Sequence, residues 1–239
     1  MVSLVNIISY SSLTNPIPPD FKTCQIGTQQ SPIPLTKSQG SSTTHTPSFD
    51  YTNQNATGSF KNWGFGPSFT LSHPEGDLSG LPSMTFEENG LNETVYLTGW
   101  HVHAPSDHTV DGLYSKAELH FVHKDINGKE RAVVGFRINP GTTTSKFFQQ
   151  LPAYIGFKDT TTTVEAEISH ELALQDIGSF SEFWTYKGGL TSPPCTEGLR
   201  WFVSQDVLSL NVQQMQALLG VSVFATRAEQ DIWLHEVNV

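Results

Sequence analysis

TVYLTGWHVHA (94–104), AELHFVH (117–123) and RAVVGFRI (131–138) are the stretches of sequence that decide the fold. In each of them apolar residues alternate with polar or small ones, which is the period-2 pattern of a β-strand. Asn127-Gly128 lies between the second and the third stretch and is a strong signal for a hairpin turn. The pattern therefore predicts consecutive strands that pair antiparallel.

Strand-like runs also dominate the rest of the chain. SFTL (68–71) and SMTF (83–86) continue the pattern, whereas helical periodicity is confined to 209–219, with Gly220 as the expected C-cap, and to 144–151, before Pro152. We find no internal repeat and no linker, and 239 residues suit one large β domain. The sequence predicts a single, mainly β domain over residues 1–239, whose first part, 1–23, is an irregular N-terminal arm.

Composition restricts the classes of partner. The formal net charge of −10 disfavours nucleic acid, because phosphates attract basic surfaces. No apolar run approaches the ~20 residues that cross a bilayer, so no membrane span is expected. The start, MVSLVNIISY, lacks the basic region and the cleavage site of a signal peptide, and we interpret the chain as a mature or trimmed form.

The cysteines and two sequons bear on the compartment. In a cytosolic enzyme Cys24 and Cys195 would be free thiols, and sequons such as those at Asn55 and Asn92 often arise by chance. Both sequons lie in polar, loop-like stretches, and lysine is scarce while serine and threonine are abundant. Together these features favour an oxidising location, and so a secreted glycoprotein or one in the cell-wall space.

Three histidines form a candidate metal site. Alternation places the rings of His101 and His103 on one face of their strand, and antiparallel pairing would bring His120 to the same face. Three imidazoles with a fourth position open describe a catalytic zinc site. An HxH pair is a weak signal in a chain with nine histidines, and His123 competes as third ligand, although its parity points it to the opposite face.

Glu118 has the same parity as His120. Its carboxylate could accept the ring N–H of a ligating histidine and so fix which nitrogen faces the metal. The alternative for Glu118 is a simple cross-strand ion pair.

Longer motifs resemble the alpha-class carbonic anhydrases, of the secreted microbial or fungal type. They are QQSPI (29–33), WHVHAPSDHTVD (100–111), AELHFVH (117–123), AVVG (132–135) and YKGGLTSPPCTEGLRW (186–201), in the order of the family. The resemblance covers most of the chain and implies a twisted, mostly antiparallel ten-stranded central sheet with a few peripheral helices. It also implies a zinc lyase that reversibly hydrates carbon dioxide to bicarbonate and a proton by a zinc-bound hydroxide.

The resemblance further implies roles for individual residues. One zinc ion per chain would be held by His101, His103 and His120, with Glu118 behind His120. Thr191 would accept the proton of the hydroxide. Asp107 would accept a hydrogen bond from the Thr191 hydroxyl, and His108 would be a buried structural histidine. Cys24 and Cys195 would form a disulfide. The substrate pocket would be lined by Val122, Val133, Leu190, Ser192 and Trp201.

Three positions depart from the family pattern. Asp107 stands where the family has a glutamate, one methylene longer, which affects how well Thr191 is oriented. Phe65, in FKNWGFG, stands at the usual proton-shuttle histidine and cannot carry a proton, while His73 and His45 are other histidines without an assigned place. Gly99 replaces a glutamine that would hold the first zinc histidine.

Two other function classes stay open from the sequence. One is a carbonic-anhydrase-like binding module without catalysis, although such relatives typically lack a zinc histidine. The other is an unrelated metalloprotein or structural sheet protein with a fortuitous HxH pair, against which the motif around Thr191 argues. The oligomeric state is open as well, a homodimer included.

Overall fold

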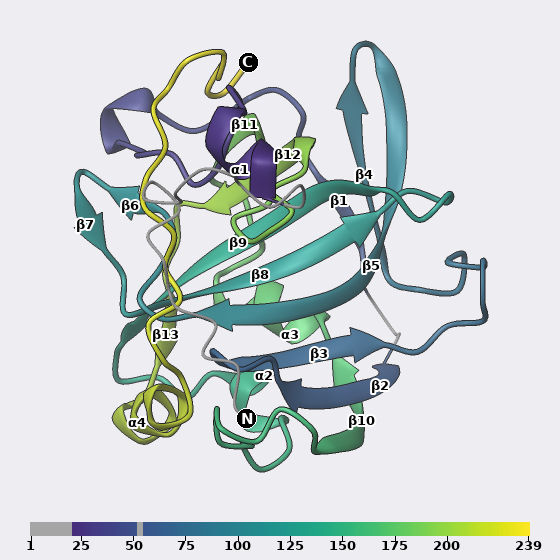
Figure 1. Ribbon diagram of the computed structural model, residues 1–239, viewed down its shortest axis with the longest axis vertical. Helices are drawn as coiled ribbons and strands as arrows, with labels where there is room; N and C mark the ends of the chain where they lie inside the picture. Colours follow the sequence, from purple (N-terminus) through teal and green to yellow (C-terminus); the bar gives the residue numbers. More distant parts are fainter. Residues whose placement is uncertain (1–20, 52–54) are drawn as a thin grey trace.

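A large twisted sheet organises the computed structural model, which describes residues 21–51 and 55–239. Eleven of the described strands form this sheet, in the order β10-β2-β3-β5-β8-β9-β12-β11, with β1, β4 and β13 attached beside this path. Figure 1 shows β5, β8 and β9 across the middle, β2, β3 and β10 below them, and β11 and β12 above. The sheet is mostly antiparallel, and the parallel pairs are those of β9 with β12 and with β13.

The strands have the following bounds: β1 (Ser48–Asp50), β2 (Asn55–Asn62), β3 (Pro67–Leu71), β4 (Ser83–Glu88), β5 (Leu91–His103), β6 (Thr109–Val110), β7 (Leu113–Tyr114), β8 (Ala117–Lys124), β9 (Glu130–Pro140), β10 (Thr163–Ser169), β11 (Phe183–Gly189), β12 (Glu197–Ser204) and β13 (Leu208–Leu210). The helices are α1 (Lys22–Ile26), α2 (Lys146–Gln149), α3 (Glu171–Asp176) and α4 (Val212–Gly220), with a 3-10 turn at Lys37–Gln39. The predicted mainly β class is confirmed, with eleven strands in the sheet instead of ten, and β6 and β7 form a separate pair.

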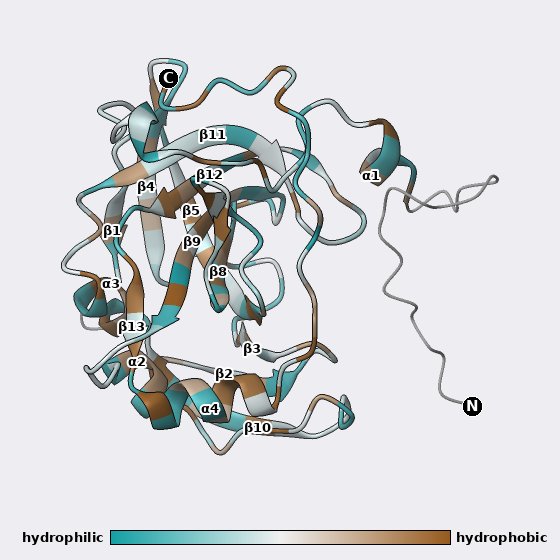
Figure 2. Cartoon of the chain, turned by 90° about the vertical axis from the view of Figure 1, so that its left-hand side faces the viewer, coloured by the Kyte–Doolittle hydropathy of each residue, from teal (hydrophilic) through white to brown (hydrophobic). Residues whose placement is uncertain are grey.

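The main hydrophobic core covers one face of the central strands. Trp100 and Val102 of β5 and Phe121 of β8 are buried in it, together with Phe147 of α2. Hydrophobic stretches on interior strands such as β9 stand out in Figure 2. Because side chains alternate along a strand, burying Trp100 and Val102 on this face sends the intervening side chains to the other face.

The predicted hairpin is present. β8 pairs antiparallel with β9, and the turn between them contains Gly128 at φ 82°, a backbone conformation that favours glycine. The Asp125 carboxylate accepts hydrogen bonds from the backbone N–H groups of Asn127 and Lys129 and so closes the loop.

Both predicted helices begin later than expected. The 209–219 pattern starts on β13, and the helix begins only after Asn211, whose side chain accepts a hydrogen bond from Gln214 N–H. Gly220 is the last helical residue, not the cap. The other helix is the short α2, which begins after Ser145 and so covers only part of 144–151.

Most of the N-terminal arm expected over residues 1–23 stays a prediction. Residues 1–20 lie outside the described part of the chain, and α1 begins at Lys22, inside the segment 1–23 expected to be irregular. Of the helices among residues 21–51 and 55–239, none is long and apolar enough to span a bilayer.

The two sequons lie on strands, not in loops as predicted. Asn55 is the first residue of β2 and Asn92 the second of β5, and both are exposed. The polar composition that suggested loops therefore reflects the solvent-facing positions of strand ends.

Candidate active site

Three histidines converge on the face of the sheet opposite the main core. His101 and His103 follow one another on β5 with Val102 between them, and His101 pairs directly with His120 of β8. The ring centroids are 4.9 Å apart for His101 and His103, 5.3 Å for His101 and His120, and 4.7 Å for His103 and His120. One nitrogen from each ring lies within 4.8 Å of the other two, so these residues could hold one metal ion.

Hydrogen bonds fix which nitrogen of two rings faces the shared point. His103 Nδ1 donates to the carbonyl oxygen of Ala225 at 2.9 Å, which leaves Nε2 as a buried lone pair with no partner among the described residues. His120 Nε2 donates to Glu118 at 3.0 Å, which leaves Nδ1 free. An orphaned buried lone pair is costly unless a cation occupies the site, so this donor set fits a metal.

Glu118 bonds to two histidines. The buried carboxylate accepts from the backbone N–H of His108 at 2.8 Å, from His108 Nδ1 at 2.7 Å and from His120. Burial by itself raises the pKa of Glu118, but the interactions with His108 and His120 outweigh it and hold the pKa well below 4.5. The ionised carboxylate is therefore bonded to histidines and is not a simple ion pair between strands.

His108 is the buried structural residue that was expected. Its Nε2 lies 2.7 Å from the hydroxyl of Tyr186, which in turn donates to Ser31 Oγ at 3.0 Å. A second metal-like group, His108 with Glu118 and His120, also has close ligand atoms. These atoms already bond to one another, so the group is a hydrogen-bond chain that supports His120.

His123 is excluded as a ligand. It is fully buried on the core face, where its Nε2 bonds to the hydroxyl of Tyr51. His123 and His120 therefore lie on opposite faces of the sheet, as their opposite parity predicts.

His101 lacks a hydrogen-bond partner within the described residues. A Cβ added at Gly99 would lie 2.7 Å from the carbonyl oxygen of Phe69, so a side chain such as glutamine does not fit there. Burial, helped by the charges of His103 and His120, lowers the pKa of His101 well below 6.5. The neutral ring is the form that binds a metal.

An apolar wall adjoins the histidines. Val122 pairs with Val133 on β9, and Val133 pairs with Trp201 on β12, so the three side chains form one row across the sheet. The indole of Trp201 lies 4.9 Å from the ring of His120, and its N–H donates to the Gly189 carbonyl at 2.9 Å. Leu190 packs against the same cluster, so the expected substrate-pocket residues come together.

The site opens into a cavity of about 750 Å³. His101, Val122 and Ser192 are among the residues that line it, and so is His73. Phe65 is half-buried and packs against Trp63 with tilted rings, whose centroids are 4.7 Å apart, and Trp63 contacts the rings of both His101 and His103. Sequence reasoning did not single out Trp63, although it lies next to the shuttle position.

Thr191 and Asp107 are both buried near the site but are not bonded to each other in the described structure. Asp107 Oδ1 accepts from the backbone N–H of Arg227 at 2.9 Å. Among the described residues its Oδ2 has no hydrogen-bond partner, and it lies 3.6 Å from His103 Nδ1, too far for a hydrogen bond. The expected hydrogen bond from Thr191 to Asp107 is therefore not formed in the described structure.

Arg227 holds the loop that carries Thr191, and no sequence motif pointed to it. Its guanidinium donates to the carbonyl oxygens of Ser31 at 2.7 Å, Cys24 at 3.0 Å and Leu190 at 3.3 Å. A buried arginine inside an aperiodic segment has no local pattern that distinguishes it from a solvated charge.

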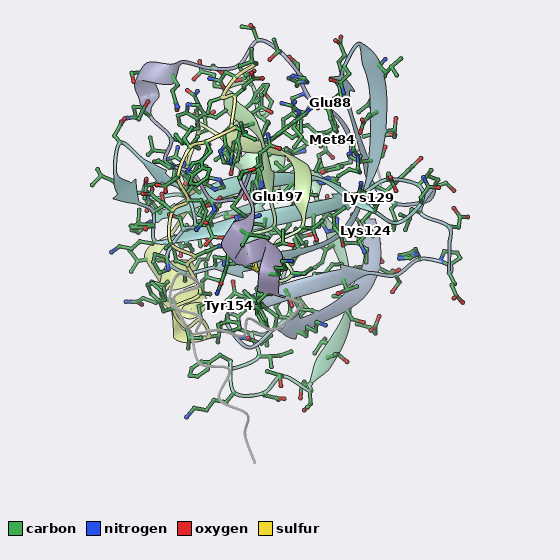
Figure 3. All side chains as sticks on the ribbon, turned by 45° about the horizontal axis from the view of Figure 1, so that its top comes forward. Met84, Glu88, Lys124, Lys129, Tyr154 and Glu197 are labelled. Atoms are coloured by element: carbon green, nitrogen blue, oxygen red, sulfur yellow. A yellow bond between two sulfur atoms is a disulfide. The ribbon has the colours of Figure 1, made fainter. Side chains whose placement is uncertain are left out.

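The expected disulfide between Cys24 and Cys195 is present. It ties α1 to the loop after Thr191, and Glu197 reinforces this junction by accepting from Gln29 N–H and from the Gln30 side chain (Figure 3). Helix α1 and the loop that carries Thr191 are therefore joined by a covalent bond, and hydrogen bonds support this junction.

Comparison with known proteins gives a consistent result. The model of the eukaryotic-type carbonic anhydrase family matches residues 18–236. A carbonic anhydrase of Pectobacterium atrosepticum is 28% identical over 207 residues, which are 85% of this chain and 76% of that protein. Alpha carbonic anhydrase 4 of Arabidopsis thaliana is 29% identical over 232 residues, 93% of this chain and 81% of the relative.

Solved structures share the fold. The alpha-carbonic anhydrase of Thermovibrio ammonificans, in complex with the inhibitor sulfanilamide, superposes with a TM-score of 0.75 at 26% identity and covers 92% of this chain and 91% of its own. Dioscorin complexed with ascorbate has the same TM-score of 0.75 at 22% identity, covers 92% of this chain and 89% of its own, and shows likeness of fold alone.

Proposed function

This chain belongs to the eukaryotic-type, or alpha, carbonic anhydrase family, and we propose that it hydrates carbon dioxide reversibly with one zinc ion held by His101, His103 and His120. Membership and fold support carbon dioxide hydration in general. The observation that carries the zinc proposal is the convergence of three imidazole nitrogens within 4.8 Å, in which His103 Nε2 is buried without a partner.

Imidazole donors suit zinc better than magnesium or calcium, which prefer oxygen ligands. When bound, zinc supplies hydroxide near neutral pH by lowering the pKa of water from about 15.7 to about 7. Glu118 holds the ring of His120, and the Ala225 carbonyl holds that of His103, so the ligands are oriented before the metal arrives.

The apolar wall fits the substrate. Carbon dioxide is small and uncharged, and the row of Val122, Val133 and Trp201 offers it a dry surface without hydrogen-bonding demands. Thr191 and Ser192 lie on the loop between β11 and β12, and Ser192 lines the cavity. Their hydroxyl groups would orient the oxygen that zinc supplies and the bicarbonate product. The hydration also releases a proton, which Phe65 cannot accept.

A binding module without catalysis is the alternative class. Its defining loss would be a blocked or missing ligand, whereas each histidine here presents a nitrogen to the same point. The geometry therefore supports an enzyme better than a binding module.

The test combines metal content with carbon dioxide hydration. The zinc-loaded protein should contain one zinc per chain, and His120→Ala should lose both zinc and hydration activity. His123→Gln is the matched control, since His123 faces the core, and it should keep stoichiometric zinc if it folds. Normal zinc and activity in His120→Ala would refute the ligand assignment.

We also propose that the sulfonamide inhibitor of the Thermovibrio ammonificans relative binds this chain at the three histidines. The disulfide, the exposed sequons and an extracellular location are mutually compatible, and we propose a secreted enzyme glycosylated at Asn55 or Asn92. Peptide mass spectrometry of native material that finds neither asparagine modified would contradict the glycosylation.

A further inference from the structure

The cavity extends well beyond the reach of carbon dioxide along one row of the sheet. Lys61 of β2 pairs with Ser68 of β3, Ser68 pairs with His101, and His101 pairs with His120. Residues that pair directly across strands point to the same side. Since neighbouring strands are about 4.8 Å apart, the backbone of Lys61 lies about 10 Å from that of His101. Lys61, Ser68 and His101 all line the cavity.

A second row beside it also lines the cavity. Thr70, Gly99 and Val122 pair in succession across β3, β5 and β8. The Phe69 carbonyl oxygen lies against the place that a Gly99 Cβ would take, so backbone forms the floor between the polar Thr70 and the apolar Val122. A volume of about 750 Å³ is in the range that holds organic ligands of moderate size.

The charge of this cavity is opposite to that of the whole chain. The sequence carries 23 acidic and 13 basic residues, yet the lining contains Lys61 and Lys124 and, among the described residues, no aspartate or glutamate. Lys124, at the end of β8 (Figure 3), is partly neutralised by Glu130 at 3.4 Å. A basic wall in an acidic protein attracts anions.

Lys61 is the second lysine that lines the cavity. It makes no ion pair with any residue in the described ranges, and its side chain is half-buried. The acidic group on the neighbouring strand, Glu165, is bonded to the hydroxyl of Ser59 and forms no ion pair with Lys61 among the described residues. Lys61 pairs with Ser68, so its side chain leaves the sheet on the same side as those of Ser68 and Thr70, and the Ser68 hydroxyl donates to the Lys61 carbonyl oxygen at 3.4 Å.

We propose that Lys61, Ser68 and Thr70 form an anion subsite that holds the carboxylate of a ligand whose other end lies at the three histidines. This subsite deepens the proposed function, because it makes the site selective for small organic acids and their derivatives over neutral molecules of the same size. Carbon dioxide itself is too small to reach the subsite from the apolar wall.

The test measures binding by calorimetry on the zinc-loaded protein with three probes of one shape. They are benzenesulfonamide, 4-carboxybenzenesulfonamide and the cationic 4-(aminomethyl)benzenesulfonamide. In low salt the carboxylate probe should bind about three- to fivefold more tightly than the neutral one, the range expected of a partly exposed ion pair. Lys61→Met should abolish this preference, leave the neutral probe unchanged and improve binding of the cationic probe. Salt at 0.5 M should weaken the preference in the unmutated protein.

Lys116→Met is the matched control. It removes the same charge from an exposed lysine that does not line the cavity, and the preference should persist. Equal effects of the two substitutions, or no preference for the carboxylate in the unmutated protein, would overturn the subsite.

A separate arm keeps the subsite distinguishable from the zinc proposal. If benzenesulfonamide fails to bind, the metal assignment is in error, and sodium benzoate then probes the subsite on the metal-free protein. Benzoate should shift the backbone amide resonances of Ser68 and Thr70 in the unmutated protein and not in Lys61→Met. Absence of these shifts would refute the subsite independently of zinc.

Discussion

Two buried histidines lead us to predict a steep loss of stability in acid. His170 is fully buried, and neither of its ring nitrogens has a hydrogen-bond partner among the described residues. The rings of Phe69, Phe121 and Phe147 lie 6.0, 5.6 and 6.4 Å from it. Burial, together with the charge of His123, lowers the pKa of His170 from 6.5 to about 3, and burial lowers that of His123 to about 3 as well.

The sign and the size of the effect follow from these values. Between pH 6.5 and 3 the unfolded chain binds a proton on each histidine, while the folded chain keeps both neutral. The free energy of unfolding is therefore intact above pH 6.5 and falls as the pH falls, by about 1.4 kcal/mol per pH unit for each histidine. From pH 6 to pH 4 each would remove about 3 kcal/mol, a large part of the roughly 5–15 kcal/mol that stabilises a typical protein.

The variant His170→Phe isolates this contribution. Phenylalanine fits an aromatic environment and does not titrate. The free energy of unfolding of the variant should therefore depend on pH less steeply than that of the unmutated protein, by about 1.4 kcal/mol per pH unit. Urea unfolding followed by tryptophan fluorescence at several pH values between 7 and 4 gives the two slopes. The exposed His73 replaced by phenylalanine is the control and should keep the unmutated slope. Parallel curves for His170→Phe and the unmutated protein would refute the reasoning.

Three further predictions concern the loop of the site and the proton. Asp107→Glu should restore a hydrogen bond to Thr191 and raise kcat up to about tenfold, and an unchanged kcat at equal zinc content would contradict this. Breaking the Cys24–Cys195 disulfide, which spans 171 residues, should lower the free energy of unfolding by about 4–5 kcal/mol in the chain-entropy account. Activity should fall at denaturant concentrations where the sheet is still folded, and unfolding curves unaffected by reduction would argue against it. Phe65→His should raise kcat in dilute buffer but not in concentrated imidazole, and high turnover of the unmutated protein in dilute buffer would show that another group carries the proton.

The histidine site could be predicted from the sequence because it depends on the alternation of side chains along a strand, which is a local property. Side chains alternate whatever the rest of the molecule does, so His101 and His103 had to share a face and His123 had to leave the face of His120. The sheet-dominated class follows from the same alternation. The pairing of His101 with His120 depended on one hairpin-like connection, and it formed as expected.

Other features depend on contacts between distant segments, and the sequence could not show them. The helix at 209–219 begins late because Ser209 and Leu210 pair with β9 as part of β13, a tertiary contact that overrides the helical pattern. Arg227 bonds to the carbonyl groups of Ser31 and Cys24, which are 196 and 203 residues away in the sequence. The sequence shows that Asp107 is one methylene shorter than glutamate, whereas only the fold shows that its Oδ2 has no hydrogen-bond partner among the described residues.

The most direct test of the central claim is the position of zinc in crystals of the zinc-loaded protein, measured from anomalous diffraction at the zinc absorption edge. We predict one strong anomalous peak per chain, about 2.0–2.1 Å from a ring nitrogen of His101, from His103 Nε2 and from His120 Nδ1. A peak elsewhere, such as among His108, Glu118 and His120, or no peak in protein saturated with zinc, would contradict it.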